Sequence, residues 1–298
     1  MENSLSIIGA GRVGRALGRR LRELGWKIGA VITRSETSAR RAVRIIGAGK
    51  PHARMTRQIV LSRVILIAAP DDEIARVARE LARIGAEELR GKVVLHTSGA
   101  LNARVLDIVK ACGAAVGSMH PLQSFSGVAV PLLEGRMFAV EGDSQAVRVA
   151  RQIARSLGGS PVRIPGGKKV LYHAAATMAA SNVLAVEEAA SQLLMSVGMK
   201  RRQATGALLT LTRQVLENME QLGPRAAWTG PLARGDFKVL EAHLEALRES
   251  PDEFARAVEA LNRLTARVLA QDAAGMLAEL EKISAGKKVK AKAMGSNA

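Results

Sequence analysis

Ile7-Ile8-Gly9-Ala10-Gly11-Arg12-Val13-Gly14 lies between an apolar run, Leu5–Ile8, and a segment with helical spacing, Arg12–Leu24. Glycines at these three positions have separate uses. Gly9 permits a tight turn, Gly11 lets the backbone approach a pyrophosphate, and Gly14 lets the helix pack against the strand. The N–H groups of the first helical turn, at Arg12 and Val13, then favour an anion. The stretch therefore predicts a strand–turn–helix unit that binds a dinucleotide.

Strand-like and helix-like segments alternate from this motif to about residue 165. The expected strands are Leu5–Ile8, Lys27–Ile32, Val64–Ala69, Lys92–Leu95, Ala114–Met119, Phe138–Glu141 and Pro161–Ile164. The expected helices are Arg12–Leu24, Ser38–Ile46, a segment from Asp71 or Asp72 to about Ile84, Asn102–Cys112 and Ser144–Leu157. Alternation of this kind is typical of α/β proteins with a doubly wound parallel sheet. Residues 1–165 are thus predicted to form a Rossmann dinucleotide-binding domain.

Only helical periodicity follows, from Lys168 to about Ser284, and Pro165-Gly166-Gly167 is the expected hinge. One long helix, Val170–Val197, is rich in small residues, which indicates a central helix of a bundle. We expect an all-α domain over residues 166–285. The basic residues 286–298 are expected to form a disordered tail.

The composition narrows the class of protein. The net charge of +17 is spread over helical segments and only 2% of the residues are aromatic, so the charge alone supports nucleic-acid binding weakly. No apolar run approaches the ~18 residues of a membrane span. A single cysteine, Cys112, argues against disulfides and a cysteine-based zinc site. We expect a cytoplasmic protein without a signal peptide, with no nucleic-acid or membrane partner.

The end of the second expected strand indicates which dinucleotide binds. NAD sites usually place an acidic residue here for the ribose 2′-hydroxyl. This chain has Thr33-Arg34-Ser35 instead, with no carboxylate before Glu36. Arg34 can pair with a 2′-phosphate, and the flanking hydroxyls can donate to it, although Arg34 could also be a solvated surface residue. We predict NADP(H), with Ala69 and Pro70 lining the cofactor cleft where another strand ends.

Two motifs with histidines follow neighbouring strands of the expected sheet. His96-Thr97-Ser98-Gly99 and Met119-His120-Pro121 both leave the sheet at the edge where ligands bind. Hydride transfer needs a proton-transfer partner, and histidine suits that role near neutral pH. We expect His120 to move the proton, with Ser98 bound to it or to the substrate and His96 nearby. The alternatives are ordinary hydrogen-bonded strand ends and a histidine metal site, which the long spacings disfavour.

A second polar group begins the long expected helix. Lys169, His173 and Thr177 fall four residues apart and share one face, which Ser181 and Asn182 continue. Such a stripe suits a surface that faces substrate, although an exposed first turn would look the same. In a later loop, Arg234 could hold an anionic substrate group, while Asp236 could cap the helix that follows.

These motifs together resemble bacterial Rossmann-like oxidoreductases that carry a C-terminal helical domain of uncharacterised function. The resemblance rests on the glycine stretch, His96-Thr97-Ser98-Gly99, Met119-His120-Pro121-Leu122-Gln123-Ser124, Tyr172-His173-Ala174-Ala175-Ala176, Thr229-Gly230-Pro231 and Arg234-Gly235-Asp236. It implies a helical domain similar to that of 6-phosphogluconate dehydrogenase. It also implies a homodimer formed through the C-terminal helices, and it implies no substrate.

More distant resemblances bear on single residues. The stretch from Ser98 through His120-Pro121 to Leu133-Glu134-Gly135 is similar to prephenate dehydrogenases, which implies a catalytic histidine at His120 and a serine partner at Ser98. The region of Lys169 and Asn182 is similar to β-hydroxyacid dehydrogenases, with different spacing and with His173 inserted. Pyrroline-5-carboxylate reductases share the architecture without these histidine motifs.

The sequence thus favours an NADP(H)-dependent oxidoreductase that acts on a small anionic substrate held between two domains. His120 is the expected acid or base, and Lys169 or Arg234 the anion-binding residue. Two other hypotheses remain. One is a sensor or regulatory protein that binds NADP(H) without catalysis, and the other, nucleic-acid binding, depends on the net charge alone.

Overall fold

The computed structural model describes residues 3–127 and 129–295, with side chains described as far as residue 285. The chain forms two compact units, Met1–Ser181 and Asn182–Ala298.

The first unit contains an eight-stranded sheet. Its strands are β1 (Ser4–Ile8), β2 (Lys27–Ile32), β3 (Lys50–His52), β4 (Val64–Ile67), β5 (Val93–His96), β6 (Ala115–Pro121), β7 (Met137–Gly142) and β8 (Ser160–Arg163). They are ordered β3-β2-β1-β4-β5-β6-β7-β8. The strands β1, β4 and β5 are buried along nearly their whole length, as continuous apolar strands of a parallel sheet should be. The predicted α/β fold is confirmed.

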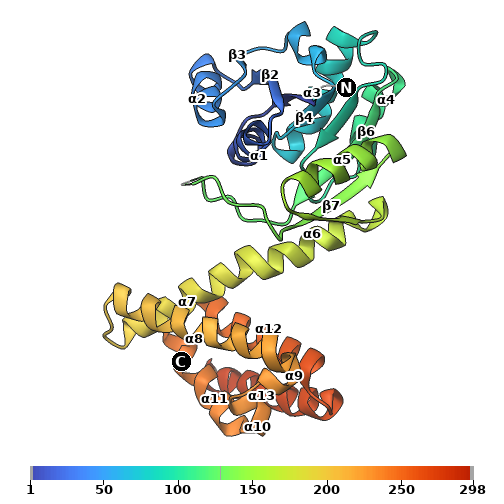
Figure 1. Cartoon of the computed structure of the whole chain (residues 1–298). Coiled ribbons are helices and arrows are strands. Elements are labelled where there is room, and N and C mark those ends of the chain that lie inside the picture. The colour runs from blue at the N-terminus through green and yellow to red at the C-terminus, as the bar shows by residue number, and fades with distance from the viewer. Residues whose placement is uncertain (1–2, 128, 296–298) are drawn as a thin grey trace. The chain divides into compact units, whose positions relative to one another are not determined.

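Helices cover both faces of this sheet (Figure 1). Apolar side chains of α1 (Arg12–Glu23), α2 (Glu36–Ile46) and α5 (Ser144–Ser156) share one core cluster. Those of α3 (Asp71–Gly85), α4 (Asp107–Ala111) and the 3-10 helices at Arg57–Leu61 and Ala103–Leu106 share another. The chain therefore winds in both directions from β1, and the β1, β4, β5 and β6 carboxyl ends meet at one edge of the sheet.

The edge that contains β7 differs from the expected all-parallel sheet. Strand β7 runs antiparallel to β6, with His120 opposite Ala139, and β8 then runs parallel to β7. The physical reason is the connection, since the described residues between β6 and β7, 122–127 and 129–136, contain no crossover helix to carry the chain back to the other end of the sheet. The short strand β3, absent from the sequence prediction, extends the opposite edge.

The single helix expected over Val170–Val197 is interrupted. A 3-10 turn at Gly166–Lys168 leads into α6 (Lys169–Thr177), a π-helical segment follows at Met178–Asn182, and α7 spans Val183–Ser196. The first unit ends inside this π-helical segment. Hence α6 belongs to the unit that contains the sheet, whereas the hinge expected at Pro165-Gly166-Gly167 placed it in the helical domain.

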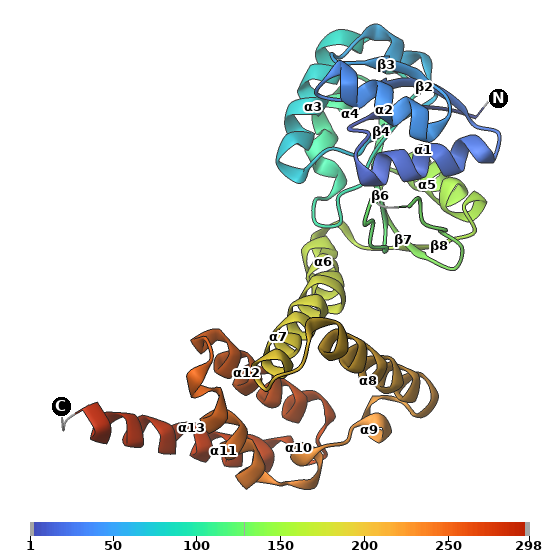
Figure 2. The ribbon, with the colours of Figure 1, turned by 90° about the vertical axis from the view of Figure 1, so that its left-hand side faces the viewer.

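The second unit is entirely helical in its described part (Figure 2). It comprises α7, α8 (Arg201–Leu222), α9 (Pro224–Ala227), α10 (Pro231–Arg234), α11 (Phe237–Ala246), a 3-10 turn at Leu247–Glu249, α12 (Asp252–Leu269) and α13 (Ala273–Gly295). Helix α7 packs along α8, and α12 packs along α13. A small core collects at Leu232, Leu240, Ala266, Leu277 and Leu280.

Helix α13 continues to Gly295, whereas the sequence predicted a tail without structure from residue 286. Residues 296–298 of that tail lie outside the described part of the chain. Among the described residues, none of the helices combines the length and apolar character that a membrane crossing requires.

Candidate active site

The glycine stretch forms the turn between β1 and α1, and the three glycines have the predicted geometry. Gly9 has a φ of +83°, and a Cβ there would lie 2.7 Å from the Ala68 carbonyl carbon. A Cβ on Gly14 would lie 2.8 Å from the Gly9 carbonyl oxygen. Around Gly11, by contrast, no atom lies within 4 Å of the Cβ position. The backbone therefore stays open at the one glycine where a phosphate is expected to approach.

The N-terminus of α1 fits an anion. Gly11 is its N-cap without a side-chain hydrogen bond, and its first turn contains no acidic residue. The free N–H groups of this turn and the positive end of the helix dipole are thus not balanced by an acidic side chain of the turn. Arg12 is exposed, and its Nη1 lies 3.5 Å from the Phe125 carbonyl oxygen. These residues, with Val13 on the same turn, fit the pyrophosphate of a dinucleotide.

The end of β2 matches the expected site for a 2′-phosphate. Ser35 is the N-cap of α2, and its Oγ accepts a hydrogen bond from Ser38 N. The Thr33 hydroxyl donates to the Ser35 carbonyl oxygen at 2.9 Å. Arg34 is exposed beside them, while the Glu36 carboxylate is paired with Arg40 at 2.9 Å. A phosphate here would meet a helix N-terminus and a guanidinium, and its nearest carboxylate is already paired.

Contacts connect this region to the next loops along the same sheet edge. Ala69 and Pro70 follow β4 and begin α3, and Gly9 packs directly on Ala68. In the first turn of α3, Asp71 accepts a hydrogen bond from the Ser98 hydroxyl at 2.8 Å. The loops after β1, β4 and β5 therefore form one continuous rim.

His96 lies beneath this rim and is fully buried. Its Nδ1 accepts from Ser98 N at 3.2 Å, and its Nε2 lies 3.3 Å from the Asn102 carbonyl oxygen. Burial, with the nearby Lys169 charge, lowers the pKa of His96 to about 3. Both ring nitrogens are engaged by the loop after β5, so His96 holds that loop in place, which was the ordinary alternative for this residue.

Ser98 differs from its predicted role as the partner of His120. Its hydroxyl proton goes to Asp71, and its oxygen accepts from Ala100 N and Leu101 N. The side chain is nearly buried, at 5% exposure. The reason is local, because the Ser98 hydroxyl accepts from the backbone N–H groups two and three residues later and so closes a turn within its own loop. Ser98 fixes the loop and leaves His120 to another partner.

That partner is Tyr172 on α6. His120 Nδ1 lies 2.8 Å from the Tyr172 hydroxyl, and the His120 and His173 rings meet edge to face at 5.8 Å between centroids. Gly99 gives them room, since a Cβ there would lie 2.4 Å from His173 Cδ2 and 3.0 Å from His120 Nε2. The end of β6, the loop after β5 and α6 thus converge on one cluster.

Burial shifts the pKa values in this cluster in opposite directions. It lowers the pKa of His120 to about 4, with help from the nearby His173 and Lys169. It also raises the pKa of Tyr172 to about 12. At neutral pH both groups are uncharged. A phenol is the stronger donor, so we assign the shared proton to Tyr172, which leaves the imidazole proton on Nε2.

Lys169 is buried instead of facing solvent at the start of α6. It is 1% exposed, and its Nζ donates to the Ser98 carbonyl oxygen and to Ser118 Oγ, both at 2.7 Å. Burial lowers the pKa of Lys169 to about 8, although Glu141 and Asp71 oppose that shift. The ammonium group ties α6 to β5 and β6. It therefore positions Tyr172 and His173, in place of the anion-binding role that the sequence suggested.

The residues predicted to bind substrate are divided between the two units, Ser181 in the first and Asn182 and Arg234 in the second. Ser181 is exposed in the π-helical segment and donates to the Thr177 carbonyl oxygen at 3.4 Å. Asn182 is exposed and begins the second unit. Arg234 pairs with Asp236 at 3.0 Å, so Asp236 holds the guanidinium instead of capping α11 with its side chain. Their contact with substrate stays a prediction.

Sequence reasoning missed three functional groups. Tyr172 is the only tyrosine of the chain, and its spacing to His120 gave no signal. Asp71 was expected only as a possible first residue of the helix that became α3. Glu141 accepts from Ala103 N at 2.9 Å and lies 3.4 Å from Ser118 Oγ, which connects β7 to Lys169. Within the described residues, no group of three His, Cys, Asp or Glu side chains gathers as metal ligands would.

Comparison with protein families matches two parts of the chain, and the boundary between them lies earlier than the one between the two compact units. Residues 2–121 match a family described as a Rossmann-like domain, and residues 136–268 match a domain of unknown function, DUF2520. The chain combines a Rossmann-like domain with a DUF2520 domain. This pairing confirms the resemblance to Rossmann-like proteins with an uncharacterised helical domain. No curated protein matches the sequence.

Solved structures share the fold of this Rossmann–DUF2520 chain. BF3122 of Bacteroides fragilis, described as a “putative NADP oxidoreductase”, is 21% identical with a TM-score of 0.71, over 88% of this chain and 97% of that one. Protein TM1727 of Thermotoga maritima is 25% identical with a TM-score of 0.64, over 87% and 98%. A reductive aminase from Aspergillus terreus in complex with NADPH is 16% identical with a TM-score of 0.64, over 97% and 94%.

Proposed function

We propose that this protein is an NADP(H)-dependent oxidoreductase that reduces, or in reverse forms, a C=O or C=N bond of a small anionic substrate. One observation carries the proposal. The rim of loops at the sheet edge runs without a break from the glycine turn, through Asp71 and Ser98, to the His120–Tyr172 pair. A dinucleotide on Gly9, Gly11 and Gly14 would extend along that edge towards the pair.

The fold relatives support the same class. The reductive aminase is solved with NADPH, and a pyrroline carboxylate reductase from Plasmodium falciparum, 16% identical with a TM-score of 0.56 over 96% of this chain and 98% of that one, is solved with NADP. For this chain the preference for NADP(H) rests on Arg34, Thr33 and Ser35 at the end of β2. Bound NADPH supplies a hydride for the reaction.

The chain's own residues supply the proton. Reduction of C=O or C=N adds a hydride to carbon and a proton to the heteroatom. In our proposal His120 donates the Nε2 proton to the heteroatom while Nδ1 takes the proton of Tyr172. Tyr172 then takes its proton back from Nδ1, and solvent returns one proton to Nε2. Lys169 keeps α6 seated so that Tyr172 stays within hydrogen-bond distance of His120.

A second candidate function, a non-catalytic NADP(H) sensor, is favoured by one observation. Both His120 and Tyr172 stay neutral at neutral pH, whereas a general acid or base is usually matched to the working pH. The two candidates predict the same cofactor and differ in whether bound NADPH is oxidised.

We propose in addition that the protein forms homodimers through its C-terminal helices. Helices α7 and α8 expose many large apolar side chains, and only Ser191 and Ala204 of these helices are buried. The exposed set comprises Val183, Leu184, Val186, Leu209, Leu211, Val215, Leu216, Met219 and Leu222. Apolar surface of this extent favours association with another protein surface.

Two measurements test the oxidoreductase. Thermal shift should show a larger stabilisation by NADPH than by NADH, and Arg34→Asp should remove the difference. NADPH oxidation should then be followed with a panel of small carbonyl and imine acids. His120→Asn and Tyr172→Phe are expected to lower turnover by about 10²–10⁴-fold, while His243→Asn, an exposed change on α11, should leave it unchanged.

The outcomes separate the candidates. Binding of NADPH without oxidation across the panel would support the sensor. Turnover that survives both His120→Asn and Tyr172→Phe would remove the proposed proton path.

A further inference from the structure

A pocket lined by arginines lies away from the rim of the proposed active site, between α5 and the edge strand β8. Its volume is about 310 Å³, and its lining residues are Ser144, Val147, Arg148, Arg151, Arg155 and Arg163. Strand β8 lies at the end of the strand order opposite to β3. None of the residues that line the pocket belongs to the glycine turn or to the His120–Tyr172 pair.

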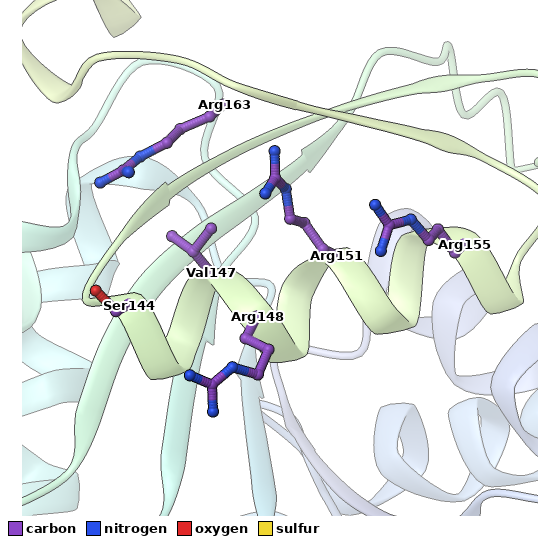
Figure 3. A pocket seen from close by; sticks show the side chains of 6 residues that line it. All are labelled: Ser144, Val147, Arg148, Arg151, Arg155 and Arg163. Carbon is purple, nitrogen blue, oxygen red and sulfur yellow. The ribbon is translucent and has the colours of Figure 1, made fainter.

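Two of the arginines, Arg151 and Arg155, rise from the same side of α5 (Figure 3). Arg163 lines the pocket from β8 with its guanidinium on the Ser144 side, and Arg148 leaves the helix on its other side. The arrangement follows from the sequence, since residues four apart on a helix lie on one face, separated by about 6 Å along its axis. Strand β8 then sets Arg163 across from them.

The charges of this pocket are not balanced by acids. No Asp or Glu lines it. Salt bridges are formed by arginines elsewhere in the described residues, for instance Arg76 with Glu73, and none of them involves Arg151, Arg155 or Arg163. Like charges four residues apart on a helix repel each other. The pocket therefore concentrates positive charge that the folded chain itself leaves uncompensated.

A buried donor without a partner distinguishes this pocket from a solvated arginine surface. Arg151 Nε is shielded from solvent and has no hydrogen-bond partner, the only such side-chain nitrogen or oxygen among the described residues. A buried N–H of a charged group is costly when it is left unpaired. A guanidinium edge presents Nε–H and Nη–H in a fork that matches two oxygens of a phosphate. An oxyanion in the pocket would satisfy that donor once the Arg151 side chain turns its Nε towards the pocket.

We propose that this pocket binds a small ligand with two adjacent phosphate groups. A diphosphate fits better than a single phosphate because Arg151 and Arg155 lie one helical turn apart and Arg163 approaches from the other wall. Arg151 and Arg155 would each hold one phosphate, and Arg163 would add positive charge from the β8 side. The exposed Ser144 hydroxyl at the start of α5 adds a further donor. The site is independent of the dinucleotide in the proposed function.

The test uses inorganic pyrophosphate and isothermal titration calorimetry. The full chain is studied with Gly11→Asp, which places a carboxylate in the glycine turn and so removes pyrophosphate binding there. The fold should tolerate it, because Gly11 has a φ of −71° and no atom lies within 4 Å of its Cβ position. We expect one pyrophosphate per chain, bound at least about tenfold more tightly than inorganic phosphate.

Two double variants are then compared in that background. Arg151→Gln/Arg155→Gln should weaken pyrophosphate binding at least about tenfold. Arg79→Gln/Arg83→Gln, which removes two exposed arginines at the same spacing on α3 over the opposite face of the sheet, should leave it unchanged. Arg151→Lys keeps the charge without the fork and should also weaken binding.

Equal binding by both double variants would overturn the proposal, as would the absence of binding in the Gly11→Asp chain. A single-stranded oligonucleotide provides the remaining comparison. Suppose that the oligonucleotide binds to the Gly11→Asp chain and to Arg79→Gln/Arg83→Gln but not to Arg151→Gln/Arg155→Gln, while pyrophosphate binds to none of these chains. The pocket then recognises a nucleic-acid backbone, and the proposal of a small diphosphate ligand is wrong.

Discussion

Substituting Lys169 by methionine tests the buried ammonium group that holds α6 against the sheet. Methionine has a similar length and no charge, so the variant keeps the packing and loses the hydrogen bonds to the Ser98 carbonyl oxygen and Ser118 Oγ. Those two acceptors would then be buried without their donor. We expect the variant to be less stable than the wild type at every pH, and the pH dependence to change as well.

The size of that change follows from the pKa of Lys169. Burial lowers it from 10.5 to about 8 in the folded chain, while the unfolded chain keeps the ordinary value. Between about pH 8 and 10.5 the unfolded chain binds more protons, so the stability of the folded state rises with pH. At about 1.4 kcal/mol per pKa unit, the difference of about 2.5 units corresponds to about 3 kcal/mol. Lys169→Met should lack this gain.

The assay is urea unfolding from about pH 7 to about pH 10.5. Trp26 is buried in the first unit, and Trp228→Phe removes the other tryptophan, so fluorescence in that background reports on the unit that contains the sheet. The control is Lys168→Met, an exposed neighbour of the same type, whose curve should run parallel to that of the wild type. If wild type and Lys169→Met gain equally between pH 8 and 10.5, Lys169 has an ordinary pKa and the reasoning fails.

Three further predictions concern the cluster and the helices. Gly99→Ala places a Cβ 2.4 Å from His173 Cδ2, so His173 must move by about 1 Å. We expect a loss of about 1–3 kcal/mol in urea unfolding and, once a substrate is identified, about 10²-fold in turnover. Gly167→Ala, with open space at its Cβ, should do neither. Because the pKa of His120 is about 4, kcat/KM for a substrate that does not titrate should be level from about pH 5 to 7, and a step near 6.5 would contradict its buried, neutral state. Leu184→Lys with Leu216→Lys should dissociate a dimer in light scattering, whereas Leu61→Lys, on a residue that is 78% exposed in the first unit, should not.

The local features of this protein were predictable from sequence because neighbouring residues determine them. The glycine turn needs Gly9 at positive φ and Gly14 against the Gly9 carbonyl, and both requirements are visible in the spacing of three glycines. The position of Arg34 was predictable in the same way, because it directly follows an apolar segment that could be recognised as a strand. The direction of β7 was not predictable in this way, because it depends on how the connection after β6 returns to the sheet.

The cluster at the sheet edge was only half predictable. His120 was found because it ends an apolar strand, but its partner Tyr172 is 52 residues away and lies on a helix assigned to the other domain. Lys169 looked exposed because it begins a polar stripe on a helix. In the structure that first turn packs beneath the ends of β5 and β6, and Ser118 and Glu141 provide the polar contacts that let an ammonium group be buried.

These errors have one physical origin, the position of α6. If the chain bent at Pro165-Gly166-Gly167 and α6 left the sheet there, His120 would have solvent beside Nδ1, Lys169 would be exposed, and neither pKa would shift. Because α6 is seated on the sheet, burial keeps His120 and Tyr172 neutral and leaves one hydrogen-bonded proton between them. Lys169 is then a requirement of the proposed chemistry although it touches no substrate. It follows that Lys169→Met should lower turnover through His120 and Tyr172 and leave NADPH affinity, which depends on β1 and β2, largely unchanged.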